Sequence, residues 1–557
     1  MMHTRNGPSP NSSSLGFITP LEPYGLLLGA IAFLASLIPS LIPRGELVQG
    51  VTGGLAFALG YAAGVGLRWL AENLQIVSRH QLHSRRRWPA AGVSAAIVLI
   101  GLALAPSWQN GVRAAMRLPH LEGFSALLAG LAALVTAVAF IAFGRLFRRL
   151  WSMLSGALRP LLPPRLATLS GLAFAIGLTW SVTSGLMGRL AVDAFDRTYA
   201  RLDALIPRGG SPPADPLKSG GPGSLVSWTS LGAQGREHML AGPTRAEIES
   251  LAGADALEPI RVYVGLNAAE TVRVRAELAL AELRRTGAFD RGTLVIATPT
   301  GTGWIDAAGT APLEYLLRGD VATVAVQYSY LPSWLSLLVE PENGVETARE
   351  VFRLIHRHWA ALPPERRPKL YLFGLSLGAL NSDLAVDLYD IMAAPHHGAL
   401  WVGPPFHSPT WREIVTKRNE GTPAWAPRYS DGRMFRFATQ DSSLADNYGA
   451  WGPLRVIYLQ YPSDPIVFFQ TGSLWRKPPI AEEPRPPDVA RDFRWIPVIS
   501  FVQMVVDMMT ATTAPRGFGH VYAAEHYLSA WTALLEPVGW PPERLEALGK
   551  RLKEHGL

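Results

Sequence analysis

The sequence contains no cysteine, and its share of charged residues is only 17%. Without cysteine the chain has no disulfide, no thiolate metal site and no thiol nucleophile. A soluble protein of ordinary composition carries about 25% charged residues. The deficit therefore indicates that part of the chain is surrounded by lipid. The length of 557 residues leaves room for more than one domain beside such a part.

The positive net charge of +7 does not predict a nucleic-acid partner. The arginines gather between long apolar runs, where they would flank a bilayer instead of forming a basic surface. We therefore expect a lipid bilayer as a partner, and no nucleic acid.

Five apolar runs are long enough to cross a hydrocarbon core of ~30 Å, which takes ~20 helical residues. They lie near Tyr24–Ile42, Leu47–Leu70, Pro89–Ala105, Phe124–Phe143 and Leu166–Leu186, and the third is the shortest. They predict an all-helical membrane domain over residues 24–190, preceded by a cytoplasmic tail over 1–23. Gly60-x-x-x-Gly64 in the second run favours close approach of another helix.

Arginines are spread unevenly over the loops between these runs. The two rich loops contain Arg79, Arg85, Arg86 and Arg87 after the second run, and Arg145, Arg148, Arg149, Arg159 and Arg165 after the fourth. Arginine-rich loops stay in the cytoplasm. A count of five spans then places the amino terminus inside and everything after the fifth span outside. Arg189, Arg197 and Arg201 follow the fifth run and disagree with this placement.

The pattern changes after the fifth run. Residues 191–258 contain a stretch rich in Pro, Gly and Ser and are expected to connect two domains. From residue 259 to 557, short apolar strands alternate with amphipathic helices. The expected strands are Arg261–Leu266, Thr293–Ala297, Val321–Gln327, Lys369–Phe373, Ala399–Val402 and Leu454–Gln460. This rhythm predicts a doubly wound α/β domain with a parallel sheet.

A candidate nucleophile lies between the fourth of these strands and the helix after it. The sequence there is Gly374-Leu375-Ser376-Leu377-Gly378. A sharp strand-to-helix turn lifts the serine oxygen above the sheet, and small residues on both sides allow the backbone to pack tightly. The amide of Leu377 would then stand at a helix amino terminus, where it can donate to an oxyanion.

A serine hydroxyl needs a base to take its proton, and the base needs an acid to orient it. In α/β-hydrolases the chain order is serine, acid, histidine. Asp464 follows the sixth expected strand, and Asp441 and Asp446 are weaker candidates because neither follows a clear strand. His520 is flanked by glycines near the end of the domain and is favoured over His526, which would lie within the last helix.

The second oxyanion donor should come from the loop Thr298-Pro299-Thr300-Gly301-Thr302-Gly303-Trp304. Gly301, Thr302 and Gly303 all stay open as the donor. The loop lacks the lysine of a phosphate-binding P-loop, and we expect neither a cofactor nor a metal. Trp304, Tyr328 and Tyr330 are candidates for the substrate pocket. The aromatic stretch Gln327–Leu338 fits either a pocket lining or a contact with the membrane interface.

Two long stretches interrupt the expected sheet, Pro404–Asn447 and Thr471–Pro515. Insertions at these places commonly cover an active site. The second contains the very apolar segment Trp495–Met509, which fits either a core helix or a lid that admits acyl chains. A hydrolase tethered to a bilayer meets lipids at high local concentration, so a lipid or lipid-linked ester is the expected substrate.

The chain resembles a family of bacterial membrane α/β-hydrolases that join a multi-span amino-terminal domain to a carboxy-terminal hydrolase domain. The matching stretches are Ser224–Arg236 (SLVSWTSLGAQGR), Thr298–Trp304, Gln327–Leu335, Phe373–Leu380, Tyr461–Pro465 and Gly519–Tyr522. The resemblance implies a multi-pass protein of the bacterial inner membrane, and the arginine pattern places its catalytic domain outside the cytoplasm.

Three hypotheses for function follow. The first is a membrane serine hydrolase that cleaves carboxylic esters through Ser376, His520 and Asp464. The second is a transacylase on envelope lipids, in which an alcohol replaces water as acyl acceptor. The third is a non-catalytic membrane protein with a hydrolase-shaped binding domain. The sequence does not define the acyl length, the head group or the oligomeric state.

Overall fold

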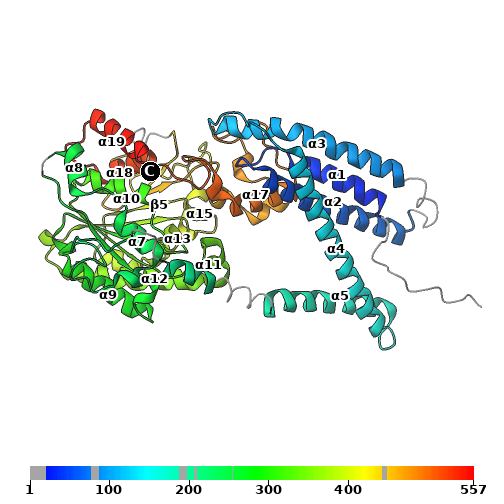
Figure 1. Cartoon of the computed structure of the whole chain (residues 1–557), viewed down its shortest axis with the longest axis horizontal. Helices are drawn as coiled ribbons and strands as arrows, with labels where there is room; N and C mark the ends of the chain where they lie inside the picture. Colours follow the sequence, from blue (N-terminus) through cyan, green and yellow to red (C-terminus); the bar gives the residue numbers. More distant parts are fainter. Residues whose placement is uncertain are drawn as a thin grey trace, which may run out of the picture. The chain divides into compact units, whose positions relative to one another are not determined.

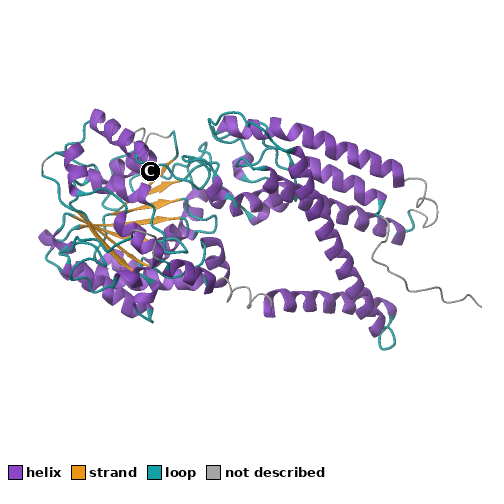
Figure 2. Ribbon diagram, in the orientation of Figure 1, coloured by secondary structure: helices purple, strands orange, loops and turns teal. Residues whose placement is uncertain are grey.

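The computed structural model describes residues 21–76, 87–186, 197–205, 210–253, 255–441, 444 and 448–557 (Figures 1 and 2). The chain divides into two compact units. The first comprises Met1–Pro39, Arg44–Gly111 and His120–Gly185. The second comprises Leu186–Leu557 together with two short segments, Ser40–Pro43 and Val112–Pro119.

The first unit is helical. Its helices are α1 (Pro23–Ser36), α2 (Glu46–Asn73), α3 (Arg87–Ala115), α4 (Ala126–Leu158) and α5 (Pro164–Trp180), followed by the π-helical turn η1 (Ser181–Leu186). Within the described residues, four stretches are long and apolar enough to cross a membrane: Glu46–Glu72, Trp88–Ala115, Ala126–Leu158 and Pro164–Gly185. The third expected run, Pro89–Ala105, lies within α3, which continues to Ala115 and so is longer than expected.

The first expected span differs from its helix. Helix α1 has 14 residues, which at 1.5 Å per residue is about 21 Å, less than the ~30 Å hydrocarbon core. It ends before Pro39, because a proline removes a helical amide and disfavours helix at the residue before it. The remainder of that apolar run, Ser40–Pro43, belongs to the second unit.

Small residues bring the helices of the first unit close together. A Cβ at Gly60 would lie 2.5 Å from the carbonyl oxygen of Leu28 in α1, and one at Gly64 would lie 2.5 Å from that of Tyr24. The close approach expected for Gly60-x-x-x-Gly64 is therefore present between α1 and α2. On another face of α2, a Cβ at Gly50 would lie 2.4 Å from the carbonyl oxygen of Ala129 in α4.

The second unit is built around one parallel sheet. Its strands are β1 (Ile260–Val264), β2 (Thr293–Thr298), β3 (Val321–Val326), β4 (Lys369–Leu375), β5 (Gly398–Val402), β6 (Phe435–Ala438) and β7 (Arg455–Leu459). They lie in the order β1-β3-β2-β4-β5-β7-β6, and every neighbouring pair is parallel. The doubly wound parallel sheet predicted from the sequence is thus confirmed.

Helices cover both faces of this sheet (Figure 1). One face carries α9 (Val272–Arg285), α12 (Pro341–Ala361) and α13 (Leu377–Ala385), and the other carries α10 (Ala307–Leu316) and α18 (Ala524–Leu535). The remaining helices are α7 (Gly232–Leu240), α8 (Arg245–Ala252), α11 (Ser333–Val339), α14 (Leu388–Ala393), α15 (Pro409–Thr416), α16 (Pro465–Phe468), α17 (Ile499–Met509) and α19 (Pro542–Glu554).

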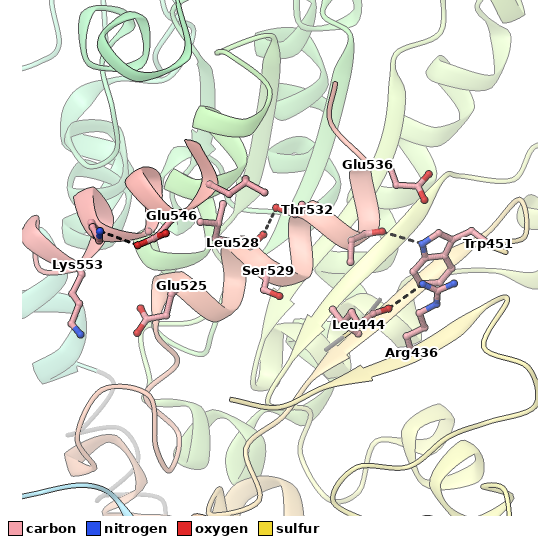
Figure 3. A pocket seen from close by; sticks show the side chains of 14 residues that line it. Arg436, Leu444, Trp451, Glu525, Leu528, Ser529, Thr532, Glu536, Glu546 and Lys553 are labelled. Atoms are coloured by element: carbon pink, nitrogen blue, oxygen red, sulfur yellow. Dashed lines mark hydrogen bonds and ion pairs between the residues drawn. The ribbon is translucent and has the colours of Figure 1, made fainter. Parts of the chain in front are cut away.

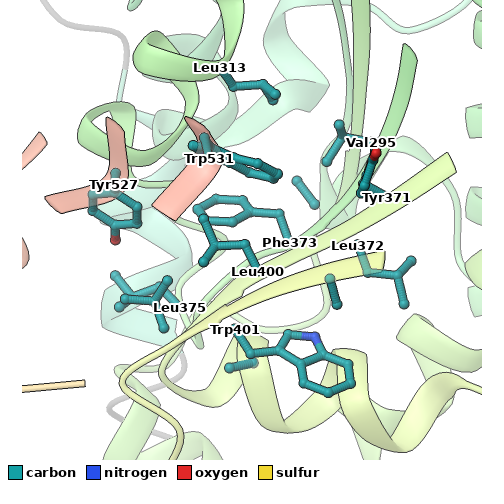
Figure 4. Packing of buried hydrophobic residues seen from close by; sticks show 14 of the residues in the cluster. Val295, Leu313, Tyr371, Leu372, Phe373, Leu375, Leu400, Trp401, Tyr527 and Trp531 are labelled. Atoms are coloured by element: carbon teal, nitrogen blue, oxygen red, sulfur yellow. The ribbon is translucent and has the colours of Figure 1, made fainter. Parts of the chain in front are cut away.

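Alternate residues of the central strands pack on opposite faces of the sheet (Figure 4). Phe373 of β4 lies beside Trp531 of α18, with ring centroids 5.9 Å apart. Trp401 of β5 points to the other face, where its indole N–H donates to Ser382 of α13. Both faces of these strands are therefore dry, which explains why the strands read as continuous apolar runs.

One strand and one connection differ from the sequence-based expectation. The four-residue strand β6 lies inside the stretch that was expected to be an insertion, and its short sequence FRFA includes an arginine. In the expected connection 191–258, residues 210–253 pack onto the sheet: the amide of Arg261 donates to Leu217, and Trp228, Leu231 and Met239 join the main core.

The two short segments of the second unit lie against the loop that contains His520. The Ser40 hydroxyl and the Leu41 amide donate to the carboxylate of Asp507 in α17, the latter at 3.2 Å. Ile42 packs with Met116 and Ala514. A Cβ at Gly519 would lie 3.2 Å from Cγ2 of Ile42. Residues from the connections α1–α2 and α3–α4 are thus part of the structure behind this loop.

Candidate active site

Ser376 occupies the sharp turn between β4 and α13. Its backbone has φ +56° and ψ −124°, a strained combination for a residue with a side chain. A Cβ at Gly374 would lie 2.5 Å from the carbonyl of Gly378, and a Cβ at Gly378 would lie 2.2 Å from the carbonyl oxygen of Thr298. Both glycines are needed because backbone occupies the space of a side chain. Leu377 begins α13, where its amide has no acceptor within the helix.

Asp464 and His520 meet in a buried hydrogen bond. His520 Nδ1 lies 2.6 Å from Asp464 Oδ2. Since a carboxylate only accepts, Nδ1 carries the proton and Nε2 is left as the basic nitrogen. Asp464 follows β7 and caps α16, because its other oxygen accepts from the amide of Ile466 at 2.9 Å. This bond fixes the plane of the carboxylate that faces the imidazole.

Two further residues shape the surroundings of the imidazole. The Tyr522 hydroxyl donates to the same Oδ2 of Asp464 at 2.8 Å. Gly403, directly after β5, has φ +51°, and a Cβ there would lie 2.8 Å from Cε1 of His520. Neither residue is predicted from the sequence. For Tyr522 the only signal was its place in the matching stretch Gly519–Tyr522, and for Gly403 it was a glycine directly after a strand.

The alternative acid and base candidates have other partners. His526 Nδ1 lies 2.6 Å from the hydroxyl of Tyr461. Asp441 does follow a strand, because β6 ends at Ala438, but it forms an ion pair with Arg117 at 3.2 Å. Asp446 lies outside the described residues. In this structure the imidazole of His520 therefore faces Asp464, and neither Asp441 nor His526 takes part in that pair.

The loop after β2 is held by its own hydrogen bonds. The amide of Gly301 donates to Ser333 at 3.1 Å, and the amide of Gly303 donates to the carbonyl of Thr300 at 2.9 Å. Gln327 donates to the carbonyl of Thr302. The amides of Gly301 and Gly303 therefore already have acceptors within the protein. Of the three candidates for the second oxyanion donor, Thr302 is the one whose amide is left for this role. Thr300 and Trp304 are the loop residues that line the cavity beside Ser376.

Ser376 and His520 line one cavity of about 570 Å³. Its apolar lining comes from several elements and includes Trp304, Trp334, Leu375, Ile466, Met508 and Met509. The last two end α17, whose inner residues, such as Met504, are part of the main core. Helix α17 is thus both a core helix and a wall of the cavity. The size and lining suit a ligand with an apolar chain.

The three pocket candidates differ in position. Trp304 lines the cavity. Tyr328 does not, because it is buried behind the turn in a cluster with Leu377 and Leu380. Tyr330 is not among the lining residues either, and its hydroxyl donates to the side chain of Asn267 at 2.5 Å. The aromatic stretch reaches the cavity through Trp334 of α11 instead, whose side chain lines the cavity while 54% of it stays exposed.

Asp306 is a buried acid in the same cavity wall. Burial raises the pKa of its carboxyl to about 6, against hydrogen bonds that favour the charged form. The Tyr527 hydroxyl donates to it at 2.8 Å, and the amide of Ala308 donates at 2.9 Å. The Ala308 bond caps α10 and the Tyr527 bond joins this cap to α18, so Asp306 serves to position α10 at the cavity wall.

A second, larger hollow of about 730 Å³ lies along α18 and α19 (Figure 3). Its lining includes Arg436, whose guanidinium stacks 3.6 Å over the ring centre of Trp451, and Glu546, which forms an ion pair with Lys550. None of Ser376, Asp464 and His520 lines it. Among the described residues, no group of three or more His, Asp or Glu side chains is placed to hold a metal ion.

The parallel sheet and the strand–serine–helix turn define a protein of the α/β-hydrolase class. Sequence comparison agrees with this assignment. The model of a family described as "Alpha/beta-hydrolase family" matches residues 260–548, and that of its companion, "Alpha/beta-hydrolase family N-terminus", matches residues 37–243. The chain belongs to this family. No curated protein and no solved structure gave a significant match.

Proposed function

We propose that this protein is a membrane-tethered serine hydrolase that cleaves carboxylic esters of lipids through Ser376, His520 and Asp464. The observation that carries the proposal is the buried pair of His520 and Asp464 at 2.6 Å, in a cavity that His520 shares with the strained Ser376. A histidine oriented by a carboxylate is the group that a serine hydroxyl needs to become a nucleophile.

In the proposed reaction, Ser376 Oγ attacks the ester carbonyl while Nε2 of His520 takes the hydroxyl proton. The carboxylate of Asp464 stabilises the imidazolium. The amide of Leu377 donates to the oxyanion, aided by the partial positive charge at the start of α13. The C–O bond then breaks, and the imidazolium gives its proton to the departing alcohol. Water, deprotonated by His520, releases the acyl group as a carboxylic acid and restores Ser376.

The apolar lining supports a lipid as the source of the ester. Met508 and Met509 at the end of α17 and two tryptophans offer a flexible apolar wall to an acyl chain. The four candidate membrane spans would keep this cavity near a bilayer, where acyl esters are concentrated.

The test uses the purified full chain in detergent and in lipid vesicles, with Ser376→Ala as the matched control. Esters of one alcohol with acyl chains of increasing length are offered at equal concentration. We expect kcat/KM to rise with chain length and to vanish in the control. Turnover restricted to short water-soluble esters, in detergent and vesicles alike, would overturn the lipid substrate.

We further propose that the chain lies in a bacterial inner membrane with the hydrolase unit outside the cytoplasm. The arginine count supports this side. The segments Ser40–Pro43 and Val112–Pro119, which belong to the hydrolase unit, support it as well. They lie in the connections α1–α2 and α3–α4, which are outside if the arginine-rich loops after α2 and α4 are inside.

The absence of cysteine makes the sidedness easy to test with single introduced cysteines. Lys550→Cys lies on the exposed surface of α19, and Arg159→Cys lies in the connection between α4 and α5. A membrane-impermeant maleimide should label the first in intact cells and the second only after permeabilisation. The reverse pattern would place the hydrolase unit in the cytoplasm.

A further inference from the structure

Helix α7 lines the cavity that contains Ser376, and its first residues belong to one of the stretches that resemble the hydrolase family. The stretch Ser224–Arg236 leads into α7, and none of its residues has a part in the proposed reaction. Gln234 and His238 lie four residues apart, on one face of the helix. Both line the cavity that also contains Ser376 and His520.

Two polar atoms on this face are buried without a partner. Nε2 of His238 and Oε1 of Gln234 make no hydrogen bond within the described part of the chain. The side chain of His238 is almost fully covered, at 4% exposure. Leaving such groups unpaired costs free energy, so they are suited to a ligand that supplies the missing hydrogen bonds.

Helix α7 contributes no positive charge to the cavity lining, and Arg516, the one arginine among the described lining residues, donates to the carbonyl oxygen of Leu557 at 2.7 Å. Burial, and then the nearby charge of Arg261, lower the pKa of His238 to about 3, so its imidazole is neutral. Arg261 itself is paired with Glu314 at 2.7 Å. The third residue that α7 contributes to the cavity is Glu237. At α7 itself, a phosphate would meet a carboxylate, an amide oxygen and a neutral ring.

We propose that Gln234 and His238 form a subsite for an uncharged hydroxyl group on the alcohol portion of the ester. The substrate class is then an acyl ester of a neutral polyol, such as glycerol or a sugar. A hydroxyl both donates and accepts, so it can donate to Oε1 of Gln234 and pair with Nε2 of His238. The inference rests on the proposed ester hydrolysis, and it assigns the apolar wall to the acyl chain.

The subsite is also linked to the loop beside Ser376. His238 lies against Tyr263, with ring centroids 6.2 Å apart, and the Tyr263 hydroxyl donates to the carbonyl of Gly303 at 2.7 Å. Gly235 permits this packing, since a Cβ there would lie 2.5 Å from the Tyr263 ring. Tyr263 therefore fixes the position of His238 relative to the loop beside Ser376.

The experiment measures specificity of the full chain in detergent. The probes share one decanoyl chain and differ in the alcohol: glycerol, glucose, methanol and glycerol phosphate. Gln234→Leu and His238→Phe remove the two polar partners, and Leu240→Ala on the same helix, outside the cavity lining, is the matched control. Rates of fluorophosphonate labelling at Ser376 report whether each variant keeps its folded site.

We expect the wild type to favour the glycerol or glucose ester over the methyl ester. Each of the two cavity variants should lower that ratio of kcat/KM about tenfold, which corresponds to one lost hydrogen bond, and Leu240→Ala should not. Preference for glycerol or for glucose tells which polyol is the source. Because Gln234 is only half-buried, Gln234→Leu tests the subsite even if His238→Phe fails to fold.

A proportional fall for all esters, with the ratio unchanged, would show that the two side chains are structural and would overturn the subsite. So would a wild type that cleaves the esters without distinguishing them, or that prefers the glycerol phosphate ester. If the wild type cleaves none of the esters, the proposed ester hydrolysis itself falls, and the subsite with it.

Discussion

The substitution Asp464→Asn tests whether the carboxylate of Asp464 orients and stabilises the imidazole of His520 or is only a buried group. One oxygen of Asp464 accepts from His520 and Tyr522, and the other accepts from the amide of Ile466. Asparagine has a single acceptor oxygen. If that oxygen faces His520, its NH2 group opposes the Ile466 amide. If it turns, NH2 faces the imidazole, which must then accept at Nδ1 and loses its basic Nε2.

Each hydrogen bond to a charged group is worth about 1.5–3 kcal/mol. Loss of the bond between Asp464 Oδ2 and His520 Nδ1 removes up to about 3 kcal/mol of stabilisation from the imidazolium, which lowers kcat about a hundredfold. The assay is kcat on a medium-chain ester, with thermal unfolding to verify the fold and Asp441→Asn as the matched control. A kcat for Asp464→Asn within tenfold of the wild type would refute the orienting role.

Three further predictions concern stability. Gly378→Ala should lower the free energy of unfolding by about 3 kcal/mol and abolish Ser376 labelling, because its Cβ meets the Thr298 carbonyl at 2.2 Å; unchanged denaturant unfolding and labelling would contradict this. His238 has a pKa of about 3 when folded against an ordinary 6.5, so the unfolded chain binds a proton that the folded chain does not. The wild type should therefore lose about 3 kcal/mol as the pH falls from 6.5 to about 4, and His238→Phe should lose correspondingly less; equal slopes in both proteins would disprove it. Asp507→Ala should cost about 2 kcal/mol, because it leaves the buried Leu41 amide without its acceptor, and a midpoint of unfolding equal to that of Asp507→Asn would argue against this.

The parallel sheet was predictable because its strands are buried on both faces. Six strands could be read as continuous apolar runs, and the turn at Ser376 could be placed because a strand and a helix adjoin it without a gap. Strand β6 was missed because four residues with a central arginine do not form such a run.

The details that depend on tertiary contacts could not be read from the sequence. Whether a loop amide is free depends on acceptors far along the chain, as with Gly301 and Ser333. Tyr328 looked like a pocket residue but follows the strand into a cluster behind Leu377. The first expected span runs past the end of α1 as far as Ile42. The apolar residues of Ser40–Pro43 do not continue the helix but pack in the hydrolase unit, as Ile42 does.

The most direct test of the catalytic centre is covalent labelling of the purified full chain with a fluorophosphonate, followed by peptide mapping. We predict one modified residue, Ser376, with labelling lost in Ser376→Ala and strongly slowed in His520→Ala. An unlabelled wild type, or a label that remains at another residue when Ser376 is replaced, would contradict the account.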